Sequence, residues 1–412
     1  MAKPSIITGL DIGTSCVKIL VALKNPDSSK LEVLGISQGP LLGVRRGVVV
    51  NIDEVSKKIS DLVREVQGSV EQKIDSVYTN IGGSHISVVP SQGAVAVSRA
   101  DQRISQEDKE RVIQSAQTFS LPFNKEILEV FPQEFIVDGE GGIKDVLGLK
   151  GVRLEVKILA LCAFSPYLDN LTNAVLNSGL QIEGIICSPI ASSRAVLTPQ
   201  QKELGVAVID IGAGTTSLAV FEEGNLIHSA VFPIGSLNIT NDIAIGLKCD
   251  IDTAERIKRE FGSCILPKKN DKNSLPKAGK KIKVVGAGQE ELVFSQKFLI
   301  EIIEARISEI FGLINKELKK IFRENLLPAG IVLTGGGSKL PKITELAKKE
   351  LKLPCRIGVP QGFLGLEEDT ALSSVCGLVL HGADLEEDIY KHSSFGKGIF
   401  NRLKKIFRVF VP

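Results

Sequence analysis

The sequence lacks tryptophan, contains a single methionine, and has only 5% aromatic residues among its 412 positions. It also lacks an excess of one charge, since 50 basic residues balance 48 acidic ones and leave a formal net charge of +2. A chain that bound nucleic acid through its overall charge would be strongly basic, so we expect no nucleic-acid partner. The hydrophobic fraction of 43% is ordinary for a folded protein, and the length predicts roughly two to four domains.

The cysteines and histidines argue against two kinds of site. Seven cysteines are present, but their number is odd, no two form a C-x-x-C pair, and most lie in apolar segments. We therefore expect reduced thiols in a cytosolic protein rather than disulfides. The four histidines are scattered, without the spacing of zinc ligands or of a nucleophile–histidine pair.

Long hydrophobic runs are missing as well. No stretch of about 20 apolar residues occurs, so we expect no membrane-spanning helix, and any contact with a membrane would be peripheral. The apolar run within residues 1–10 is too short for a secretory signal peptide.

What the sequence does contain is an internal duplication. Residues 6–15 and residues 206–216 both read as an apolar strand that ends in Asp-Ile-Gly and is followed by a turn of small and hydroxylated residues. Two further strand-like runs follow each copy. A separation of about 200 residues indicates two similar domains rather than a short structural repeat. The sequence therefore predicts two duplicated α/β lobes.

Both Asp-Ile-Gly turns carry groups that bind a nucleotide polyphosphate. Phosphates are bound by closely approaching backbone N–H groups and hydroxyl donors, and a hydrated magnesium ion is bound by carboxylates. Asp11 and Asp210 end their strands, where two facing lobes would bring both carboxylates to one Mg²⁺ through water. Lys18 would reach a phosphate if its side chain leaves the strand on that side. The other candidate residues of the two turns are Gly13, Thr14, Ser15, Gly212, Gly214, Thr215 and Thr216.

A third turn follows an apolar strand late in the chain. It consists of Gly335, Gly336, Gly337 and Ser338, which lie between that strand and a predicted helix start. Bare glycine backbone at this point would let a flat adenine or ribose lie against the chain. Each of the three turns alone is also explained as a tight link between elements, but their joint occurrence favours a nucleotide site.

The order of these turns resembles that of the phosphate-1, phosphate-2 and adenosine motifs in the actin/Hsp70/sugar-kinase superfamily. The resemblance implies an α/β fold of duplicated, ribonuclease H-like lobes around an ATP cleft, with ATP and Mg²⁺ as cofactors. Gly235, before a predicted insertion in the second lobe, belongs to the same implied site. Residues 253–258 resemble the Ala-Glu-x-x-Lys helix of bacterial actins, which implies that Glu255 and Lys258 reach the ribose and adenine. An ordinary surface ion pair would also explain these two residues.

The C-terminal segment 396–412 combines an apolar face with a purely basic one. Its apolar residues fall within one arc of a helix, and no acidic residue follows Asp388. A short, terminal, cationic helix rich in Phe is typical of an anchor that lies in the membrane plane and binds anionic lipid. A helix packed on the protein's own core is the alternative. The predicted membrane contacts are Lys397, Ile399, Phe400, Arg402, Leu403, Lys404, Lys405, Ile406, Phe407, Arg408 and Phe410.

Nearly the whole chain resembles the FtsA family of bacterial cell-division proteins. Segments within residues 80–155 resemble the small domain that this family inserts in its first lobe. Residues 302–310 resemble the helix that receives the C-terminal peptide of the tubulin-like protein FtsZ, which implies contacts through Arg306 and Glu309. The predicted organisation is a first lobe at 1–83 and 161–200 with the FtsA-type inserted domain at 84–160, a second lobe at 201–241 and 325–370 with an insertion at 242–324, a hinge helix at 371–383, a linker at 384–395 and the amphipathic helix at 396–412.

The resemblance implies an ATP-binding, actin-like cell-division protein. Such a protein would form filaments on the cytoplasmic face of the inner membrane, tether FtsZ there at the division site, and help to recruit later divisome proteins. Two alternatives remain, a small-molecule kinase of the same superfold and an actin-like pilus-assembly adaptor. The kinase would need a general-base Asp, and the pilus adaptor would lack the C-terminal anchor.

One position departs from the superfamily pattern. Superfamily ATPases place a Glu or Gln near the hinge helix to orient the attacking water, whereas the corresponding stretch here, 187–192, offers Ser188. A serine is a poor group for positioning a nucleophile. We therefore expect ATP to bind tightly and to be hydrolysed slowly, with a turnover below the roughly 1 s⁻¹ of dedicated kinases.

Overall fold

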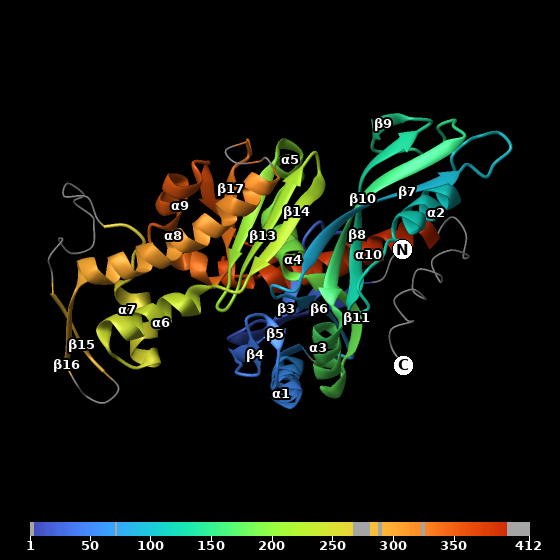
Figure 1. Cartoon of the computed structure of the whole chain (residues 1–412). Helices are drawn as coiled ribbons and strands as arrows, with labels where there is room; N and C mark the ends of the chain where they lie inside the picture. The colour runs from blue at the N-terminus through green and yellow to red at the C-terminus, as the bar shows by residue number, and fades with distance from the viewer. Residues whose placement is uncertain are drawn as a thin grey trace.

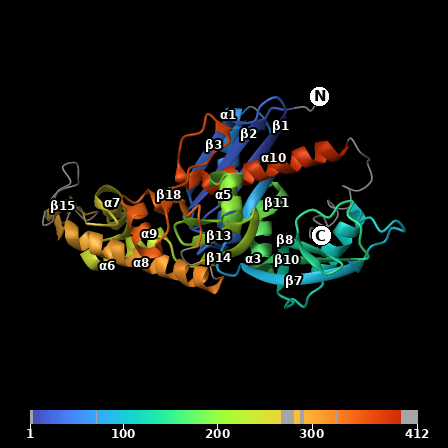
Figure 2. The ribbon, with the colours of Figure 1, turned by 90° about the horizontal axis from the view of Figure 1, so that it is seen from above.

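A computed structural model of the chain describes residues 4–70, 72–266, 281–286, 291–321, 323 and 326–393. Two sheets of like topology form the middle of an elongated molecule, and two smaller units lie at its opposite ends (Figure 1 and Figure 2). One of these units holds a third sheet, and the other is mainly helical. The predicted membrane helix at 396–412 lies outside the described residues.

The first lobe is built on a six-stranded sheet. β1, β2 and β3 form an antiparallel meander, while β6 and β11 extend the sheet in parallel from β1. The near-continuous apolar sequences of β1 and β2 fit their burial on both faces. In spatial order the strands are β11 (Gln181–Cys187), β6 (Ser76–Ile81), β1 (Ser5–Ile12), β2 (Cys16–Lys24), β3 (Leu31–Pro40) and β19 (Phe363–Leu364).

The second lobe repeats this order in five strands. An antiparallel meander is again followed by strands that are parallel to the first strand of the meander. The duplication includes the register, because Asp11 is paired across its hairpin with Lys18, and Asp210 with Ser217. The predicted duplication of two α/β lobes is thus confirmed. In spatial order the strands are β14 (Asn225–Phe232), β13 (Thr216–Glu222), β12 (Val206–Ile211), β17 (Ile331–Thr334) and β18 (Cys355–Ile357).

An antiparallel sheet with its own hydrophobic core is inserted into the first lobe. The helix α2 (Gln106–Ala116) packs against it and begins with a reciprocal capping box between Ser105 and Asp108. The sheet also contacts the second lobe, since the Gln133 side chain donates to the Leu226 carbonyl at 3.0 Å. Its strands, in spatial order, are β7 (Ser87–Ala96), β10 (Arg153–Phe164), β8 (Lys125–Val137) and β9 (Glu140–Ile143).

The mainly helical unit extends the second lobe. The hydroxyl of Ser295 caps its longest helix by accepting a hydrogen bond from the Phe298 N–H. One face of this helix, which includes Ile303, Ile307 and Ile310, packs into the core of the second lobe. The elements of this unit are α6 (Ser236–Leu247), α7 (Ile251–Phe261), β15 (Lys281–Val285), β16 (Glu291–Ser295) and α8 (Gln296–Lys320).

The remaining elements surround the two central sheets. In the described ranges, no helix is both long enough and apolar enough to cross a bilayer. These elements are β4 (Val44–Arg45), β5 (Val48–Val49), α1 (Ile52–Val70), α3 (Ser165–Asn177), α4 (Ser188–Val196), α5 (Pro199–Leu204), the 3₁₀ helix η1 (Gly336–Lys339), α9 (Ile343–Leu351), the 3₁₀ helix η2 (Thr370–Leu372) and α10 (Ser373–Ser393).

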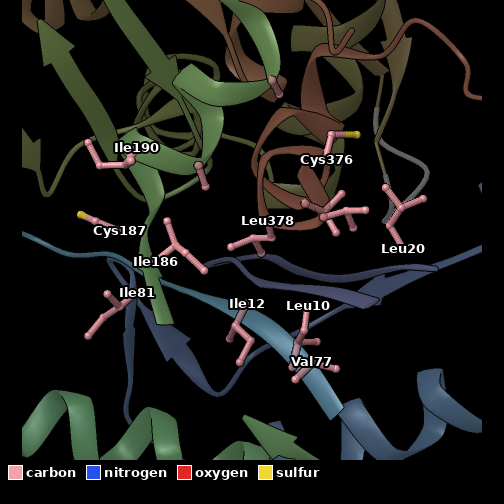
Figure 3. Close-up of a cluster of buried hydrophobic side chains, with 14 of the residues drawn as sticks. Leu10, Ile12, Leu20, Val77, Ile81, Ile186, Cys187, Ile190, Cys376 and Leu378 are labelled. Atoms are coloured by element: carbon pink, nitrogen blue, oxygen red, sulfur yellow. The ribbon is translucent and has the colours of Figure 1, made fainter. Parts of the chain in front are cut away.

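The helix α10 returns the chain to the first lobe. Cys376 and Leu378 lie in one hydrophobic cluster with Leu10 of β1 and Ile190 of α4 (Figure 3). The sequence predicts a linker from residue 384, but the helix continues as far as Ser393. Polar contacts explain the difference, because Asp384 forms an ion pair with Arg194 and Glu386 accepts a hydrogen bond from Ser5.

Candidate functional site

Two equivalent turns form the centre of the candidate site. Asp11 lies near the end of β1 and Asp210 near the end of β12. The Gly13 N–H then donates to the Cys16 carbonyl at 3.0 Å, and the Gly212 N–H donates to the Thr215 carbonyl at 2.9 Å. The duplicated sequence thus produces the same tight turn in both lobes.

The two turns meet across the junction of the lobes. A Cβ atom at position 214 would lie 2.6 Å from Thr14 Cγ2, so the approach of Thr14 to the other turn requires glycine there. Thr14 Oγ1 also accepts a hydrogen bond from the Gly47 N–H at 3.0 Å. Gly47 has a φ of +79° and lies so close to the backbone of Gly83 that a Cβ would be 2.9 Å from its nitrogen. The junction therefore brings together backbone N–H groups, hydroxyls and glycines from four segments of the chain.

Two carboxylates lie at this junction. Asp11 Oδ2 accepts from Lys18 Nζ at 2.8 Å, and its Oδ1 accepts from Asn80 Nδ2 at 2.8 Å. Asp210 accepts a hydrogen bond from Ser374 Oγ at 3.2 Å. Burial, reinforced by the negative charge of Asp11, raises the pKa of Asp210 to about 6. The sequence leaves open whether Lys18 reaches a phosphate, and the structure places its ammonium group in an ion pair with Asp11.

This donor set fits a hydrated magnesium ion. Mg²⁺ usually keeps several waters and is bound by one or two carboxylates together with substrate phosphates. Among the described residues no cluster of three or more His, Cys, Asp or Glu side chains is arranged to hold a metal. The carboxylates of Asp11 and Asp210, which are close enough to interact electrostatically, supply the one or two that Mg²⁺ needs. A divalent cation between them would also relieve the repulsion that raises the pKa of Asp210.

The N-terminus of α6 abuts the turn of the second lobe. The N–H groups of Ser236 and Leu237 donate to the carbonyls of Gly212 and Ala213 at 2.9 and 2.8 Å. A Cβ atom at position 235 would lie 2.6 Å from the Ala213 carbonyl oxygen, so Gly235 permits this close approach. Glycine here therefore serves backbone packing at the turn.

Glu255 and Lys258 form a polar cluster between α6 and α7. Lys258 Nζ lies 2.6 Å from Glu255 Oε2, and both groups are hydrogen-bonded to Thr240 Oγ1, at 2.8 and 2.6 Å. Lys258 is only 6% exposed, which distinguishes this pair from a solvated surface pair. Burial lowers the pKa of Lys258. The pair is held in a fixed position beside the N-terminal turn of α6, because Lys258 also donates to the Ser236 carbonyl at 3.2 Å.

The triple-glycine turn is only partly a bare surface. Gly335 has a φ of +82°, and a Cβ atom there would lie 2.2 Å from Asp210 Oδ1. A Cβ atom at Gly337 would lie 2.4 Å from the side chain of Ile211. Gly336, by contrast, would meet nothing closer than Ala371 Cβ at 4.0 Å. Two of the three glycines thus serve the packing of this turn against the end of β12, and Gly336 leaves backbone accessible.

Ser188 is engaged in hydrogen bonds within the protein. Its hydroxyl donates to the Ile81 carbonyl at 3.1 Å and accepts from Asn80 Nδ2 at 3.1 Å. Neighbouring His85 is engaged as well, because Nε2 lies 2.9 Å from the Gly82 carbonyl and Nδ1 accepts from the Phe164 N–H at 3.3 Å. Burial lowers the pKa of His85, so it is neutral at pH 7. Neither group is free to activate a water.

Arg306 of α8, the residue predicted to contact a peptide, already forms an ion pair within the protein. Arg306 forms a forked pair with Asp242 of α6, with Nε–Oδ2 and Nη2–Oδ1 distances of 2.6 and 2.8 Å, and it also contacts Glu309. On the same two helices, the side chains of Ile245 and Phe298 are 76% and 44% exposed. The surface of α6 and α8 thus combines a fixed guanidinium with exposed apolar residues.

Sequence motifs identify most of this site but not all of it. The structure brings Asp11, Thr14, Asp210 and the glycines of both turns to one junction, and it places Lys18 in an ion pair with Asp11. It adds Gly47, Gly83, Asn80 and Ser374, which lie in segments that carry no nucleotide motif of their own. For Gly47 a signal was available, because a single glycine within a strand-like run often marks the close approach of another backbone.

Two family models match the chain. The model for cell division protein FtsA matches residues 207–377, and the model for the SHS2 domain inserted in FtsA matches residues 83–162. The chain is 38% identical over 387 residues to cell division protein FtsA of Pseudomonas aeruginosa, and this match covers 93% of this chain and 90% of that protein. It is 37% identical over 413 residues to cell division protein FtsA of Neisseria meningitidis serogroup B, with 97% of each covered.

Solved structures support the same architecture. The PilM–PilN type IV pilus biogenesis complex matches with a TM-score of 0.64 at 18% identity, covering 91% of this chain and 98% of that chain. MreB5 of Spiroplasma citri bound to ADP matches with a TM-score of 0.54 at 14% identity, and the match covers 96% of this chain and 99% of that chain. These likenesses concern the fold and confirm the predicted actin-like arrangement, while the match of the SHS2 model confirms the inserted domain. The pilus protein shares that fold, whereas the higher sequence identities are to cell division proteins.

Proposed function

This chain belongs to the FtsA family of cell division proteins, and on that premise we propose that it binds ATP, forms filaments on the cytoplasmic face of the inner membrane, and tethers FtsZ there. The cell-division role and the actin-like fold come with the family. ATP, the membrane and the FtsZ peptide are each argued below from the residues that would bind them.

The observation that carries the nucleotide proposal is the contact between the two Asp-Ile-Gly turns. Thr14 of one turn lies against Gly214 of the other, beside the carboxylates of Asp11 and Asp210. Such a junction offers phosphate groups N–H and hydroxyl donors from both lobes at once. MreB5, which has the same fold, was solved with ADP. ATP bound here would hold the two lobes together and favour one conformation of the chain.

Each group of the nucleotide has residues suited to it. Asp11 and Asp210 would hold Mg²⁺ through water, and the ion would neutralise charge on the phosphates. The phosphates would meet the turns that contain Thr14 and Thr215. The ribose and adenine would lie between Glu255 and Lys258 on one side and the backbone of Gly336 on the other.

Hydrolysis at this site would be slow. In this superfamily a Glu or Gln near the hinge helix orients the attacking water, and here Ser188 donates its proton to the Ile81 carbonyl instead. His85 is also neutral and engaged at both nitrogens, so it is not available as a general base. The nucleotide would therefore act mainly as a conformational and assembly cofactor.

The surface of α6 and α8 suits the C-terminal peptide of FtsZ. Arg306 is held by Asp242 and is only partly exposed, so its guanidinium is oriented before any peptide arrives. An acidic peptide side chain would add to this charge network, and apolar peptide residues would cover Ile245 and Phe298. Peptide recognition on a helical groove commonly combines these two kinds of contact.

Attachment to the membrane would come from the amphipathic segment 396–412. Its basic residues would meet anionic lipid, and its apolar residues would enter the interface. α10 runs along the first lobe and ends at Ser393, three positions before this segment begins. Filament formation and the recruitment of later divisome proteins follow from the family resemblance.

The nucleotide proposal is tested with a fluorescent ATP analogue and Mg²⁺. We expect wild type to bind the analogue and Gly214→Ala to bind it at least roughly tenfold more weakly, because the new methyl group would push Thr14 out of the junction. Gly312→Ala is the matched control, since nothing lies within 4 Å of the added Cβ on the exposed face of α8. A wild-type chain that binds no nucleotide, or a Gly214→Ala variant that binds as wild type does, would refute the assignment.

A further inference from the structure

Asn80 links three elements at the predicted metal site. It is the second-last residue of β6 and only 5% exposed. Its side-chain oxygen accepts from the Ile12 N–H at 2.7 Å, at the end of β1. Its side-chain nitrogen donates to Asp11 Oδ1 at 2.8 Å and to Ser188 Oγ at 3.1 Å, at the start of α4. Both N–H groups and the oxygen of this amide are therefore satisfied.

Chemistry fixes the orientation of this amide. A backbone N–H can only donate and an ionised carboxylate can only accept, so Asn80 must turn its oxygen to Ile12 and its nitrogen to Asp11. Rotating the amide by half a turn would place its oxygen against the carboxylate and its N–H groups against another N–H. The bond to Asp11 is consequently an enforced, charge-assisted one.

The bond leaves the Asp11 carboxylate with one possible orientation. Lys18 holds Oδ2 and Asn80 holds Oδ1, so both oxygens are fixed by buried or nearly buried donors. The carboxylate of Asp210, by contrast, interacts with the hydroxyls of Ser374 and Ser192, and its partner across the hairpin is Ser217, where the first lobe has Lys18. The two carboxylates thus differ in their donors, since an ammonium and an amide hold Asp11 whereas hydroxyls contact Asp210.

We propose that Asn80 is the positioning residue that orients Asp11 toward the hydrated Mg²⁺ of a bound nucleotide. This rests on the proposed nucleotide site. Residues that hydrogen-bond a metal-binding carboxylate fix its orientation, and their loss typically weakens metal affinity by roughly 10- to 100-fold. Asn80 suits this role because it is neutral: it supports the carboxylate without adding a charge that would compete with the ion. Its second N–H ties this support to α4 through Ser188.

The test is a Mg²⁺ titration of the full chain with a fluorescent ATP analogue at fixed concentration. We expect Asn80→Ala to raise the Mg²⁺ concentration for half-maximal binding by roughly 10- to 100-fold. Binding of the analogue in EDTA should stay within about threefold of wild type, because Asn80 would not touch the nucleotide. Ser188→Ala removes the other bond of the same amide, and it should leave the Mg²⁺ titration within about threefold of wild type.

Three outcomes decide the matter. An Asn80→Ala variant with the wild-type Mg²⁺ dependence would overturn the role of Asn80 alone. Ser188→Ala losing as much Mg²⁺ affinity as Asn80→Ala would also overturn it, since the effect would then belong to the packing of the strand ends. A wild type without Mg²⁺-dependent binding would instead overturn the proposed nucleotide function on which the role depends.

A second variant covers the case in which Asn80→Ala does not fold. Asn80→Ser keeps a small polar and neutral side chain, but its hydroxyl lies where the amide carbon was, one bond short of both the Ile12 N–H and Asp11 Oδ1. With a far-UV circular dichroism spectrum like that of wild type, it should show the same weakened Mg²⁺ dependence at pH 8. Wild-type Mg²⁺ affinity in this folded variant would overturn the proposal.

Discussion

Asp210 carries its charge in a half-buried position, where it interacts with a second carboxylate, Asp11. Its pKa of about 6 in the folded protein is above the value of 3.8 for an unperturbed Asp. Because the folded state binds the proton more tightly than the unfolded state, ionisation of Asp210 lowers the free energy of unfolding. This loss grows as the pH rises from about 4 to about 6 and is complete above that range.

We expect Asp210→Asn to stabilise the nucleotide-free chain, and to do so more at pH 8 than at pH 5. The amide removes a half-buried charge, and that charge is costly only where Asp210 is ionised. The melting temperature without nucleotide, measured at both pH values, reports this effect. The variant should also lose the increase in melting temperature that ATP with Mg²⁺ gives wild type. A lower melting temperature for the variant than for wild type at pH 8 would contradict the explanation.

Ser188 offers a test of why hydrolysis should be slow. We expect Ser188→Glu to raise the rate of phosphate release from ATP by roughly tenfold or more, because a carboxylate at this position can orient the attacking water. Ser188→Ala, the control, should hydrolyse ATP as slowly as wild type. If Ser188→Glu is no faster, the slow step does not depend on this position.

Residues that belong to a motif could be predicted, and residues that act through distant contacts could not. Asp11, Asp210 and the turn residues follow directly from the duplicated Asp-Ile-Gly sequence. Asn80 reaches Asp11 across 69 positions of the chain, and Ser374 reaches Asp210 across 164. No local pattern encodes such contacts, because they exist only once the sheets have formed.

The packing of α10 against α4 depends on a close approach of their backbones. A Cβ atom at Gly377 would lie 1.7 Å from the carbonyl oxygen of Ala191, so α10 and α4 pack backbone to backbone. The sequence predicts a hinge helix at 371–383, but not that the helix continues to Ser393. Its polar second half reads as a linker, and tertiary contacts of Asp384 and Glu386 keep it helical.

We expect Gly377→Ala to destabilise the protein by about 3 kcal/mol or more, because neither backbone can move without disturbing a central sheet. The same substitution at Gly312 should be neutral or stabilising by up to about 1 kcal/mol, since it adds a methyl group to an exposed helix surface and improves helix propensity. Thermal melting of the two variants compares the same chemical change in two helices. Equal melting temperatures would show that the helices do not pack as described.

The surface of α6 and α8 allows a prediction about peptide binding. Arg306→Glu should weaken binding of an FtsZ C-terminal peptide by roughly tenfold or more, because it replaces the cation with an anion next to Asp242. Lys320→Glu makes the same charge change at the exposed far end of α8 and should have little effect. Fluorescence anisotropy of a labelled peptide measures both. Similar losses in the two variants would indicate non-specific attraction of charge.

At the scale of the whole molecule, the inserted sheet bridges the two lobes. Besides the bond from Gln133 to Leu226, the Asn225 side chain donates to the Gln133 carbonyl at 3.2 Å. Lys144 adds a bond to the Glu223 carbonyl at 3.0 Å. Movement of the lobes would therefore be transmitted to this unit. The duplicated lobes could be predicted from their repeated strands, whereas these bridging contacts could not, because they join surfaces without a sequence repeat.

The most direct test of the proposed tether is flotation with vesicles that contain anionic lipid, in the presence of ATP, Mg²⁺ and FtsZ. The full chain is compared with a chain that ends at Ser394. We expect the full chain to float and to carry FtsZ with it, while the shortened chain and its FtsZ stay at the bottom of the gradient. If both chains float equally, or if neither does, segment 396–412 is not the anchor, and if no FtsZ floats with the full chain, the tethering role is wrong.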